Sequence, residues 1–596
     1  MSSVPERSEI DDEYKWDLDS IYANDDEWEA AYEEVKERLE ELRDYEGRAT
    51  EGGETLLSVL ELRDEVMRQV STVGAYARMR SDEDTRDQQY QALSTRAQSL
   101  SSAAGSAASF IGPEIQSCSR EELETMVEGT DGLELYEHYL DDVVRMKPHT
   151  RSAEVEALLS DLGEVLSAPG EAYNRLLNAD ITFPTVERPD GEAVEITQAN
   201  FTTLLRDSAR EFRRTVHEGF YDELETVRNT VGSTLENSVK TDVKMARTRS
   251  YETAREAAMD GPNVPVEVYD NLVDTVRENL DVLHRHAELK RRSLGVDELR
   301  MWDLYMPMTE TESPEVEYDD AEGHVVDAVA PLGEDYQRRV AEGLESNWVD
   351  VYENRGKRSG AYSGGTYDTH PFILMNYQED ISSMFTLAHE LGHSLHSQLT
   401  SENQPYVYSD YEIFVAEVAS TVNETLLTHH LLDTVEDETF RRHVLNEYLE
   451  RFRSTLYRQT MFADFEHRIH TASEDGEALT PDRLDELYGE LKDEFYEPAL
   501  TDEHIAREWM RIPHFYYNYY VYQYSTGVSA AVAIVKRILE EGEAAAADYL
   551  DALELGGSAY PIETLETAGV DMTSPEPVED AIEEYRAYLE EMADLI

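Results

Sequence analysis

The chain has 596 residues, of which 52 are Lys or Arg and 128 are Asp or Glu, so its formal net charge is −76. This charge would repel a nucleic-acid backbone over most of the surface, which excludes nucleic acid as a partner. The hydrophobic fraction of 40% excludes a disordered chain, and the length predicts at least two lobes.

The basic residues are unevenly divided, with nine Lys and therefore 43 Arg. Together with the acidity, this resembles proteins of salt-accumulating microbes, in which about molar salt shortens the Debye length to roughly 3 Å and screens self-repulsion. We therefore expect a halophilic, archaeal source. Cys118 is the only cysteine, which excludes an internal disulfide and a cysteine-built zinc site. The first residues lack a signal segment and no run is long enough to span a membrane, which predicts a cytoplasmic protein without a membrane partner.

The first part of the chain predicts long packed helices, because apolar residues recur every three or four positions from Trp16 to about Tyr173. The pattern breaks at residues 181–197, where β-branched residues flank a Pro-Asp-Gly turn and predict a small hairpin. We expect an N-terminal helical lobe over residues 1–200 and a second lobe over residues 201–596.

In the second lobe, a connecting segment at residues 294–320 is followed by helices, and apolar residues at 371–377 predict a short strand. A helix is predicted to follow, with Asp380 as its N-cap. Its buried stripe is expected to consist of Met384, Ala388, Leu391, Leu395 and Leu399. Residues 411–432 predict a second buried helix.

The first of these two helices carries His389, Glu390 and His393, which fit the pattern H-E-x-x-H. Residues four apart lie about 40° apart around a helix, so both imidazoles can bind one zinc ion. Glu390 projects about 100° away from His389, beside the metal, where its carboxylate can take a proton from zinc-bound water.

A third ligand is expected on the second helix. Glu417 lies 24 residues after His393 among apolar neighbours, and a zinc ion would supply the charge that a buried carboxylate needs. These residues make a His₂Glu site with one position open to water. Asp410, Glu412 and Glu424 are alternatives, of which the first two lie near a loop and are easier to hydrate. Glu424 is seven residues beyond Glu417 on the same face, and is a candidate for orienting a ligand histidine.

Two other features could contribute to the same site: His396 and the Tyr-rich segment 512–527. His396 shares the face of His393 and is expected beside the metal, because a fourth protein ligand would close the site to water. Residues 512–527, IPHFYYNYYVYQYSTG, are rich in Tyr, which suits stacking against peptide side chains and donating to an oxyanion. A packed aromatic helix explains the same run equally well.

Several motifs together resemble oligoendopeptidase F, in the thimet oligopeptidase superfamily of zinc peptidases. In chain order they are YKWDLDSIY, GKRSGAYSGG, HELGHSLH, FVAEVASTVNE, IPHFYYNYYVYQYSTG and LELGGSAYPIETLETAGVDM. The resemblance implies a mainly helical, two-lobed, clam-like zincin fold with a deep channel and a small β-sheet next to the HExxH helix. It also implies the family's N-terminal region at about residues 115–185 and a peptidase catalytic domain over 201–596.

The resemblance further implies roles for individual residues. The ligands of a single zinc ion are then His389, His393 and Glu417. Glu390 is the catalytic acid and base. The substrate-side donors are expected to be His514, Tyr522 and Tyr524, in that order. Gly392 matches a small position of the family, where a missing side chain would let a neighbouring segment approach the helix closely.

The expected function is that of a zinc metalloendopeptidase that hydrolyses internal bonds of short oligopeptides. The peptide would lie extended along the segment 363–377 and be recognised through its backbone. One alternative is a zinc carboxypeptidase or dipeptidyl carboxypeptidase, which needs a cation for the free substrate carboxylate. Candidates for that cation are Arg355, Lys357 and Arg358. Another alternative is a non-catalytic peptide-binding helical scaffold with structural zinc. Cobalt or manganese also suits a His₂Glu site.

Overall fold

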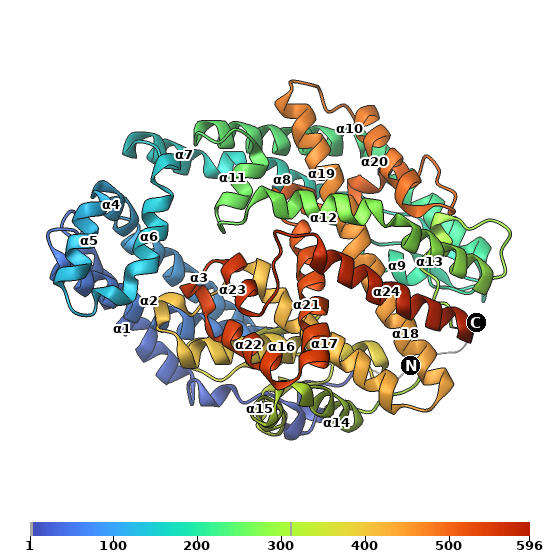
Figure 1. Cartoon of the computed structure of the whole chain (residues 1–596), viewed down its shortest axis with the longest axis horizontal. Coiled ribbons are helices and arrows are strands. Elements are labelled where there is room, and N and C mark those ends of the chain that lie inside the picture. Colours follow the sequence, from blue (N-terminus) through green and yellow to red (C-terminus); the bar gives the residue numbers. More distant parts are fainter. Residues whose placement is uncertain (1–3, 310–312) are drawn as a thin grey trace. The chain divides into compact units, whose positions relative to one another are not determined.

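The computed structural model describes residues 4–309 and 313–596. These residues form mostly helices and two small β-sheets, which confirms the mainly helical fold class (Figure 1). None of the helices in the described residues combines the length and the apolar character that a membrane span requires.

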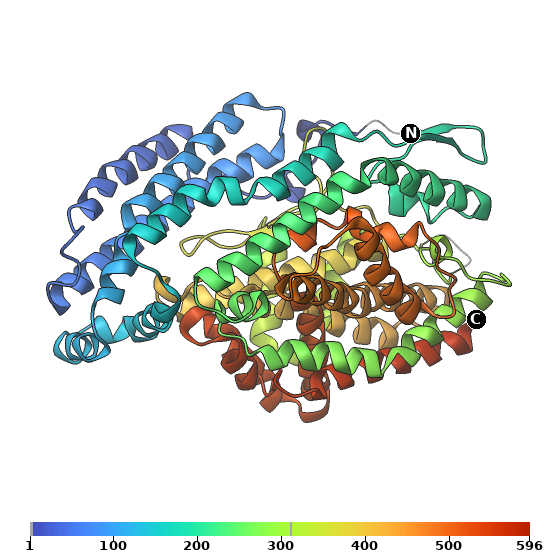
Figure 2. The ribbon, with the colours of Figure 1, turned by 90° about the horizontal axis from the view of Figure 1, so that it is seen from above.

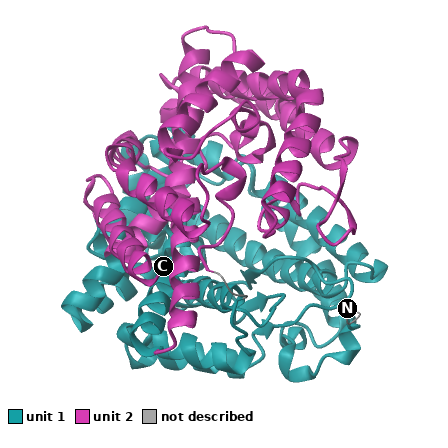
Figure 3. Cartoon of the chain, turned by 90° about the vertical axis from the view of Figure 1, so that its right-hand side faces the viewer, with its two compact units in different colours: residues 1–147, 313–435, 534–570 teal, residues 148–312, 436–533, 571–596 magenta. Residues whose placement is uncertain are grey.

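The chain forms two compact units, each built from three separate stretches (Figure 3). Unit 1 comprises Met1–Lys147, Ser313–Val435 and Ile534–Val570. Unit 2 comprises Pro148–Glu312, Glu436–Ala533 and Asp571–Ile596. The expected boundary near residue 200 concerns domains along the sequence and stays a prediction.

Unit 1 begins with three helices that pack side by side, as the apolar spacing predicted (Figures 1 and 2). Trp28 of the first is fully buried and donates a hydrogen bond from Nε1 to the carbonyl of Val73 at 2.9 Å. The helices of this unit are α1 Asp25–Arg43, α2 Gly53–Glu83, α3 Gln88–Ala108, α4 Ile111–Ser117, α5 Arg120–Gly129, α6 Glu137–Arg145, α14 Tyr318–Ala328, α15 Glu334–Glu345, α16 Ile381–Asn403, α17 Ile413–Thr434, α22 Glu543–Glu554 and α23 Pro561–Thr567.

A three-stranded sheet in unit 1 lies against α16. Its strands are β3 Val349–Asp350, β4 Tyr362–Gly364 and β5 Phe372–Leu374, in the order β3-β5-β4. β5 is buried, pairs parallel to β3 and antiparallel to β4, and confirms the strand predicted at 371–377. The small sheet next to the HExxH helix is therefore present, and β4 is one of its edges.

Helices α16 and α17 pack closely against each other. Asp380 caps α16 by accepting a hydrogen bond from the Ser383 N–H at 2.7 Å, and the predicted apolar stripe of this helix is buried. A Cβ on Gly392 would lie 2.6 Å from the Ala419 carbonyl oxygen and 2.6 Å from the Cα of Ser420. The missing side chain thus permits the close approach that the sequence predicted.

Unit 2 contains the predicted hairpin, formed by β1 Thr185–Glu187 and β2 Ala193–Glu195 with Val186 opposite Val194. In the described part of the connecting segment, the short helical turn Met301–Asp303 precedes α14. Residues 310–312 of this segment lie outside the described residues. The helices of this unit are α7 Ala153–Leu166, α8 Ala168–Arg175, α9 Phe201–Leu204, α10 Arg210–Thr248, α11 Ala254–Asp260, α12 Val266–Glu278, α13 Leu280–Ser293, α18 Glu438–Phe452, α19 Arg458–Glu474, α20 Pro481–Tyr496 and α24 Glu576–Leu595. Helix α21, Tyr522–Glu541, belongs partly to each unit.

Candidate metal centre

Three side chains from α16 and α17 converge in unit 1, and we call them the α16–α17 centre: His389, His393 and Glu417. The two imidazole Nε2 atoms are 3.2 Å apart. Oε2 of Glu417 lies 3.7 Å from Nε2 of His389 and 3.9 Å from Nε2 of His393. Bonds of about 2.0 Å in a tetrahedral zinc site put neighbouring ligand atoms about 3.3 Å apart. The donor types and spacing therefore fit a divalent metal ion, with a movement of about half an ångström by the carboxylate.

The imidazole of His389 is oriented by a carboxylate on α17. Its Nδ1 lies 2.8 Å from Oε1 of Glu424, which leaves Nε2 facing the other two donors. Burial lowers the pKa of His389, but neighbouring carboxylates, Glu424 first, raise it to about 9. A divalent ion at Nε2 would replace the proton there while Nδ1–H stays with Glu424. The sequence expected Glu424 in this position.

The second imidazole is a neutral donor. Burial, together with the positive charge of His389, lowers the pKa of His393 to about 3, against the raising effects of Glu424 and of a hydrogen bond to the backbone of Ala416. A neutral imidazole has the lone pair that a metal ion requires. The two histidines therefore reach the same point from one face of α16, as the four-residue spacing predicted.

Glu390 lies on α16 outside this donor triangle. Its side chain is only 6% exposed, and burial raises its pKa to about 7, although His389 and a hydrogen bond from the Ser363 N–H act in the opposite direction. Ser363 is on β4, and its Oγ lies 2.8 Å from Oγ of Ser394 on α16. A carboxyl group that titrates near neutrality can both accept and return a proton.

A cavity of about 770 Å³ opens beside the centre in unit 1. Its lining includes His393 and Glu417, together with the glycines at 364 and 365 that follow Ser363. Among the described residues that line it there is neither Arg nor Lys. The cavity is thus next to two of the candidate ligands, and the described part of its wall offers no Arg or Lys for a substrate carboxylate.

The structure separates the remaining candidates on the two helices. His396 is 1% exposed and stacks on Tyr411, with ring centroids 3.6 Å apart, and burial lowers its pKa to about 3. Asp410 lines the cavity, and Glu412 precedes α17. Among the described residues, neither acid joins the group of donors that contains Glu417.

Two residues near the centre were not identified from the sequence. Tyr411 covers His396 and hydrogen-bonds Ser397 through its hydroxyl at 2.8 Å. No local pattern distinguishes Tyr411 from other tyrosines. Ser363 donates a backbone hydrogen bond to Glu390 and lies inside the motif GKRSGAYSGG. The sequence analysis identified the motif but did not predict this hydrogen bond.

The Tyr-rich segment lies in unit 2. His514 and Tyr524 come together, with ring centroids 6.0 Å apart, and both are partly exposed. Tyr522 is 2% exposed and packs on Tyr269 at a centroid distance of 5.3 Å, so it is the least accessible of the three expected donors. Burial, with a smaller effect of Arg458, lowers the pKa of His514. Their contacts with substrate stay predictions.

Comparison with known proteins adds family information. A model of peptidase family M3 matches residues 203–584, and a model of oligopeptidase F matches residues 114–183. The chain is 44% identical, over all of its length and 89% of the relative, to oligopeptidase PepF of Bacillus subtilis. It is 39% identical, over 99% of its length and 98% of the relative, to group B oligopeptidase PepB of Streptococcus agalactiae.

Solved structures of peptidases are also similar to this chain along nearly its whole length. The structure of oligoendopeptidase-F from Enterococcus faecium matches with a TM-score of 0.75 at 37% identity, covering 96% of this chain and 99% of that one. A putative peptidase from Chlamydophila abortus matches with a TM-score of 0.91 at 32% identity, covering 100% of both chains.

Proposed function

The chain belongs to peptidase family M3, and on this basis we infer that it is a metalloendopeptidase that acts on oligopeptides. The observation that carries this inference is a triangle of two imidazoles and one carboxylate, with the buried carboxyl group of Glu390 beside it.

We propose zinc as the metal and the α16–α17 centre as its site. Two imidazole nitrogens and one carboxylate oxygen are a donor set typical of catalytic zinc, which leaves a coordination position for water or substrate. When bound, zinc supplies Lewis-acid polarisation of the scissile carbonyl and acidifies water. In this proposal Glu424 holds His389 in the tautomer that binds the ion, and a hydrogen bond to the backbone of Ala416 restrains the imidazole of His393.

Glu390 is proposed as the acid and base. Its carboxyl group takes the proton of the attacking water and later gives it to the leaving amine. The pKa near 7 that burial produces suits both steps at neutral pH. The Ser363 N–H donates a hydrogen bond to this carboxyl group and so restrains it.

The endopeptidase hypothesis is favoured over the carboxypeptidase hypothesis because the cations that a carboxypeptidase would need are already paired with carboxylates. Lys357 is buried and pairs with Asp350 at 2.6 Å, so it cannot hold a substrate carboxylate. Arg355 lies 3.6 Å from Glu6. Arg358 lies 3.5 Å from an oxygen of Asp82. The described lining of the cavity adds no other Arg or Lys.

Further expectations complete the proposal. We propose cleavage of internal bonds in short peptides, recognised along the edge strand β4, with His514 and Tyr524 as better candidates for substrate-side donors than the buried Tyr522.

We also propose that the sequence divides near residue 200 into an N-terminal lobe and a catalytic domain. The acidic, Lys-poor composition supports a cytoplasmic protein of a salt-accumulating, archaeal source.

The experiment uses an internally quenched peptide of about ten residues, blocked at both ends, in about 2 M KCl. We expect internal cleavage that a chelator abolishes and zinc restores. Glu390→Gln should retain its metal and lose about 10²–10⁴-fold in turnover, because the proton acceptor is gone. Glu342→Gln on α15, where the residue is exposed and paired with Arg338, is the matched control and should stay active. Wild-type rates from Glu390→Gln, or cleavage only of peptides with a free carboxyl terminus, would contradict the proposal.

A further inference from the structure

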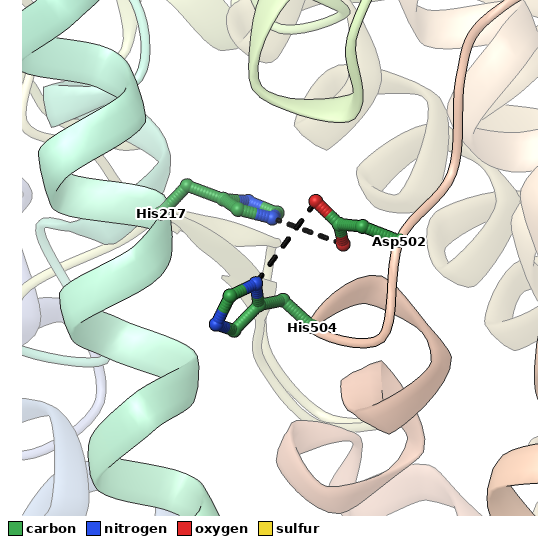
Figure 4. A group of neighbouring side chains, drawn as sticks. All are labelled: His217, Asp502 and His504. Atoms are coloured by element: carbon green, nitrogen blue, oxygen red, sulfur yellow. Dashed lines mark ion pairs between the residues drawn. The ribbon is translucent and has the colours of Figure 1, made fainter.

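A second group of metal-ligand side chains lies in unit 2 and shares no residue with the α16–α17 centre (Figure 4). We call it the α10 cluster: His217, Asp502 and His504. His217 is on helix α10, and the other two residues lie in the turn that leads into the short helix η11, Ile505–Arg511. The candidate donor atoms all lie within 4.8 Å of one another.

The distances between the carboxylate and the imidazoles resemble those of the first centre. Oδ1 of Asp502 is 3.7 Å from Nε2 of His217, and Oδ2 is 4.0 Å from Nδ1 of His504. Glu417 lies 3.7 and 3.9 Å from its two histidines through the single oxygen Oε2, whereas Asp502 faces its two histidines with different oxygens. The two distances in the α10 cluster are too long for hydrogen bonds, so its carboxylate and its two imidazoles face one another without bonding directly.

His217 supplies the strongest evidence that something occupies this space. Its side chain is 1% exposed, and its Nε2 has no hydrogen-bond partner in the part of the chain that the structure describes. Figure 4 shows this nitrogen directed toward the Asp502 carboxylate. A buried polar nitrogen left without a partner costs about 1–3 kcal/mol. A metal ion in this space would satisfy it through the lone pair of the neutral imidazole.

The other two side chains are already held in position. Nε2 of His504 lies 3.0 Å from Oδ1 of Asp222 on α10, which leaves Nδ1 facing Asp502. Asp502 also accepts a hydrogen bond from the Ile505 N–H at 2.9 Å. A carboxylate on the far nitrogen of a histidine is the usual support of a metal ligand, and Glu424 has that position in the first centre.

We propose that the α10 cluster binds a divalent transition-metal ion with Nε2 of His217, Nδ1 of His504 and a carboxylate oxygen of Asp502 as ligands. Two imidazole nitrogens and one carboxylate oxygen select zinc, cobalt or nickel over magnesium and calcium, which prefer oxygen. The side chains of Asp502 and His504 are 24% and 19% exposed, so water can complete the coordination and the ion can enter from solvent.

The ion would act as a cross-link within unit 2. It would join α10, the longest helix described, to the segment that continues through η11 to His514. These two elements already pack against each other. Because a metal ion that binds only the folded arrangement stabilises it, occupancy should raise the thermal midpoint of this unit. This inference does not depend on the proposed peptidase activity.

The test counts bound metal in a chain without the first centre. The double variant His389→Gln/His393→Gln is freed of metal with a chelator and dialysed against Zn²⁺, or against Co²⁺ for its absorption spectrum, in about 2 M KCl to suppress loose binding to surface carboxylates. We expect about one ion per chain. Adding Asp502→Asn should remove this ion, while the amide oxygen still accepts the bond from Ile505. Adding His149→Gln, a partly buried histidine of the same unit bonded to the Arg249 carbonyl, should leave the ion in place.

Folding of each variant is checked by circular dichroism, and a zinc-dependent rise of the unfolding midpoint that Asp502→Asn abolishes is the second readout. If Asp502→Asn fails to fold, Asp222→Asn replaces it, and we expect the dissociation constant to rise about 10–100-fold because only the support of His504 is lost. The absence of a bound ion in the double variant would overturn the proposal. An ion whose affinity neither Asp502→Asn nor Asp222→Asn changes would overturn it too.

Discussion

Gly392 controls the distance between the two helices that carry the candidate metal ligands, and Gly392→Ala tests this directly. The added Cβ would lie 2.6 Å from the Ala419 carbonyl oxygen, 2.6 Å from the Ser420 Cα and 2.8 Å from the Ser420 nitrogen. All three atoms belong to the backbone of α17, so no flexible side chain can move away. Ordinary contact begins at 3.4 Å, and the helices would have to separate locally by about 0.8 Å, which is 3.4 minus 2.6 Å.

The expected energetic cost follows from this overlap. Overpacking a close contact costs about 1–3 kcal/mol of unfolding free energy. Replacing Gly by Ala inside a helix returns up to about 1 kcal/mol through backbone entropy, so the net loss should be about 1–2 kcal/mol. The same separation moves Glu417 away from His389 and His393, which are already further from it than zinc bonds require. Metal affinity should therefore fall together with stability.

The assay compares unfolding midpoints and zinc dissociation constants with those of a matched variant. Gly323→Ala is the same change in α14 of the same unit, at an exposed position where the new Cβ would meet nothing within 4 Å. It should stabilise the protein by about 0.5–1 kcal/mol and leave zinc binding unchanged. If Gly392→Ala were as stable as Gly323→Ala and held zinc equally well, the argument from helix contact would be wrong.

Two other predictions concern histidines that lie beside carboxylates. Glu424→Gln should weaken zinc binding about 10–100-fold, measured by competition with a chromogenic chelator, because His389 loses the carboxylate that orients it; unchanged affinity would contradict that role. Burial lowers the pKa of His286 to about 4, despite the raising effect of Glu450, so the unfolded chain takes up this proton first. Stability contributed by neutral His286 is complete above pH 6.5 and is lost as the pH falls toward 4. His286→Gln should therefore make the unfolding free energy less dependent on pH across that window by up to about one proton, and an identical slope in both proteins would contradict the assignment.

Much of the site could be predicted from the sequence because its signals are local. The cap at Asp380, the buried stripe of α16 and the pairing of His389 with His393 all depend on residues within one helix. A repeat of 3.6 residues per turn is enough to place such side chains on one face. The hairpin of β1 and β2 is equally local, since its turn residues and its strands are contiguous.

Which carboxylate serves as the third ligand depends on how α17 packs on α16, and not on the local sequence. Asp410, Glu412, Glu417 and Glu424 lie within fifteen residues. The apolar neighbours of Glu417 favoured it as the ligand, but the local pattern did not exclude the other three. The packing of α17 on α16 brings Glu417 to the two Nε2 atoms and Glu424 to the opposite side of His389. The glycine at 392 permits the close approach of the two helices at this point.

Composition and helical periodicity therefore determined that the protein is mainly helical, and its motifs determined the family to which it belongs. Only the tertiary structure separated the buried Tyr522 from the accessible Tyr524, and only it brought His217 to Asp502 and His504 from distant parts of the chain. Periodicity shows which residues share a face of one helix. Which faces meet depends on the packing of side chains between elements far apart in sequence, and a local pattern does not contain that information.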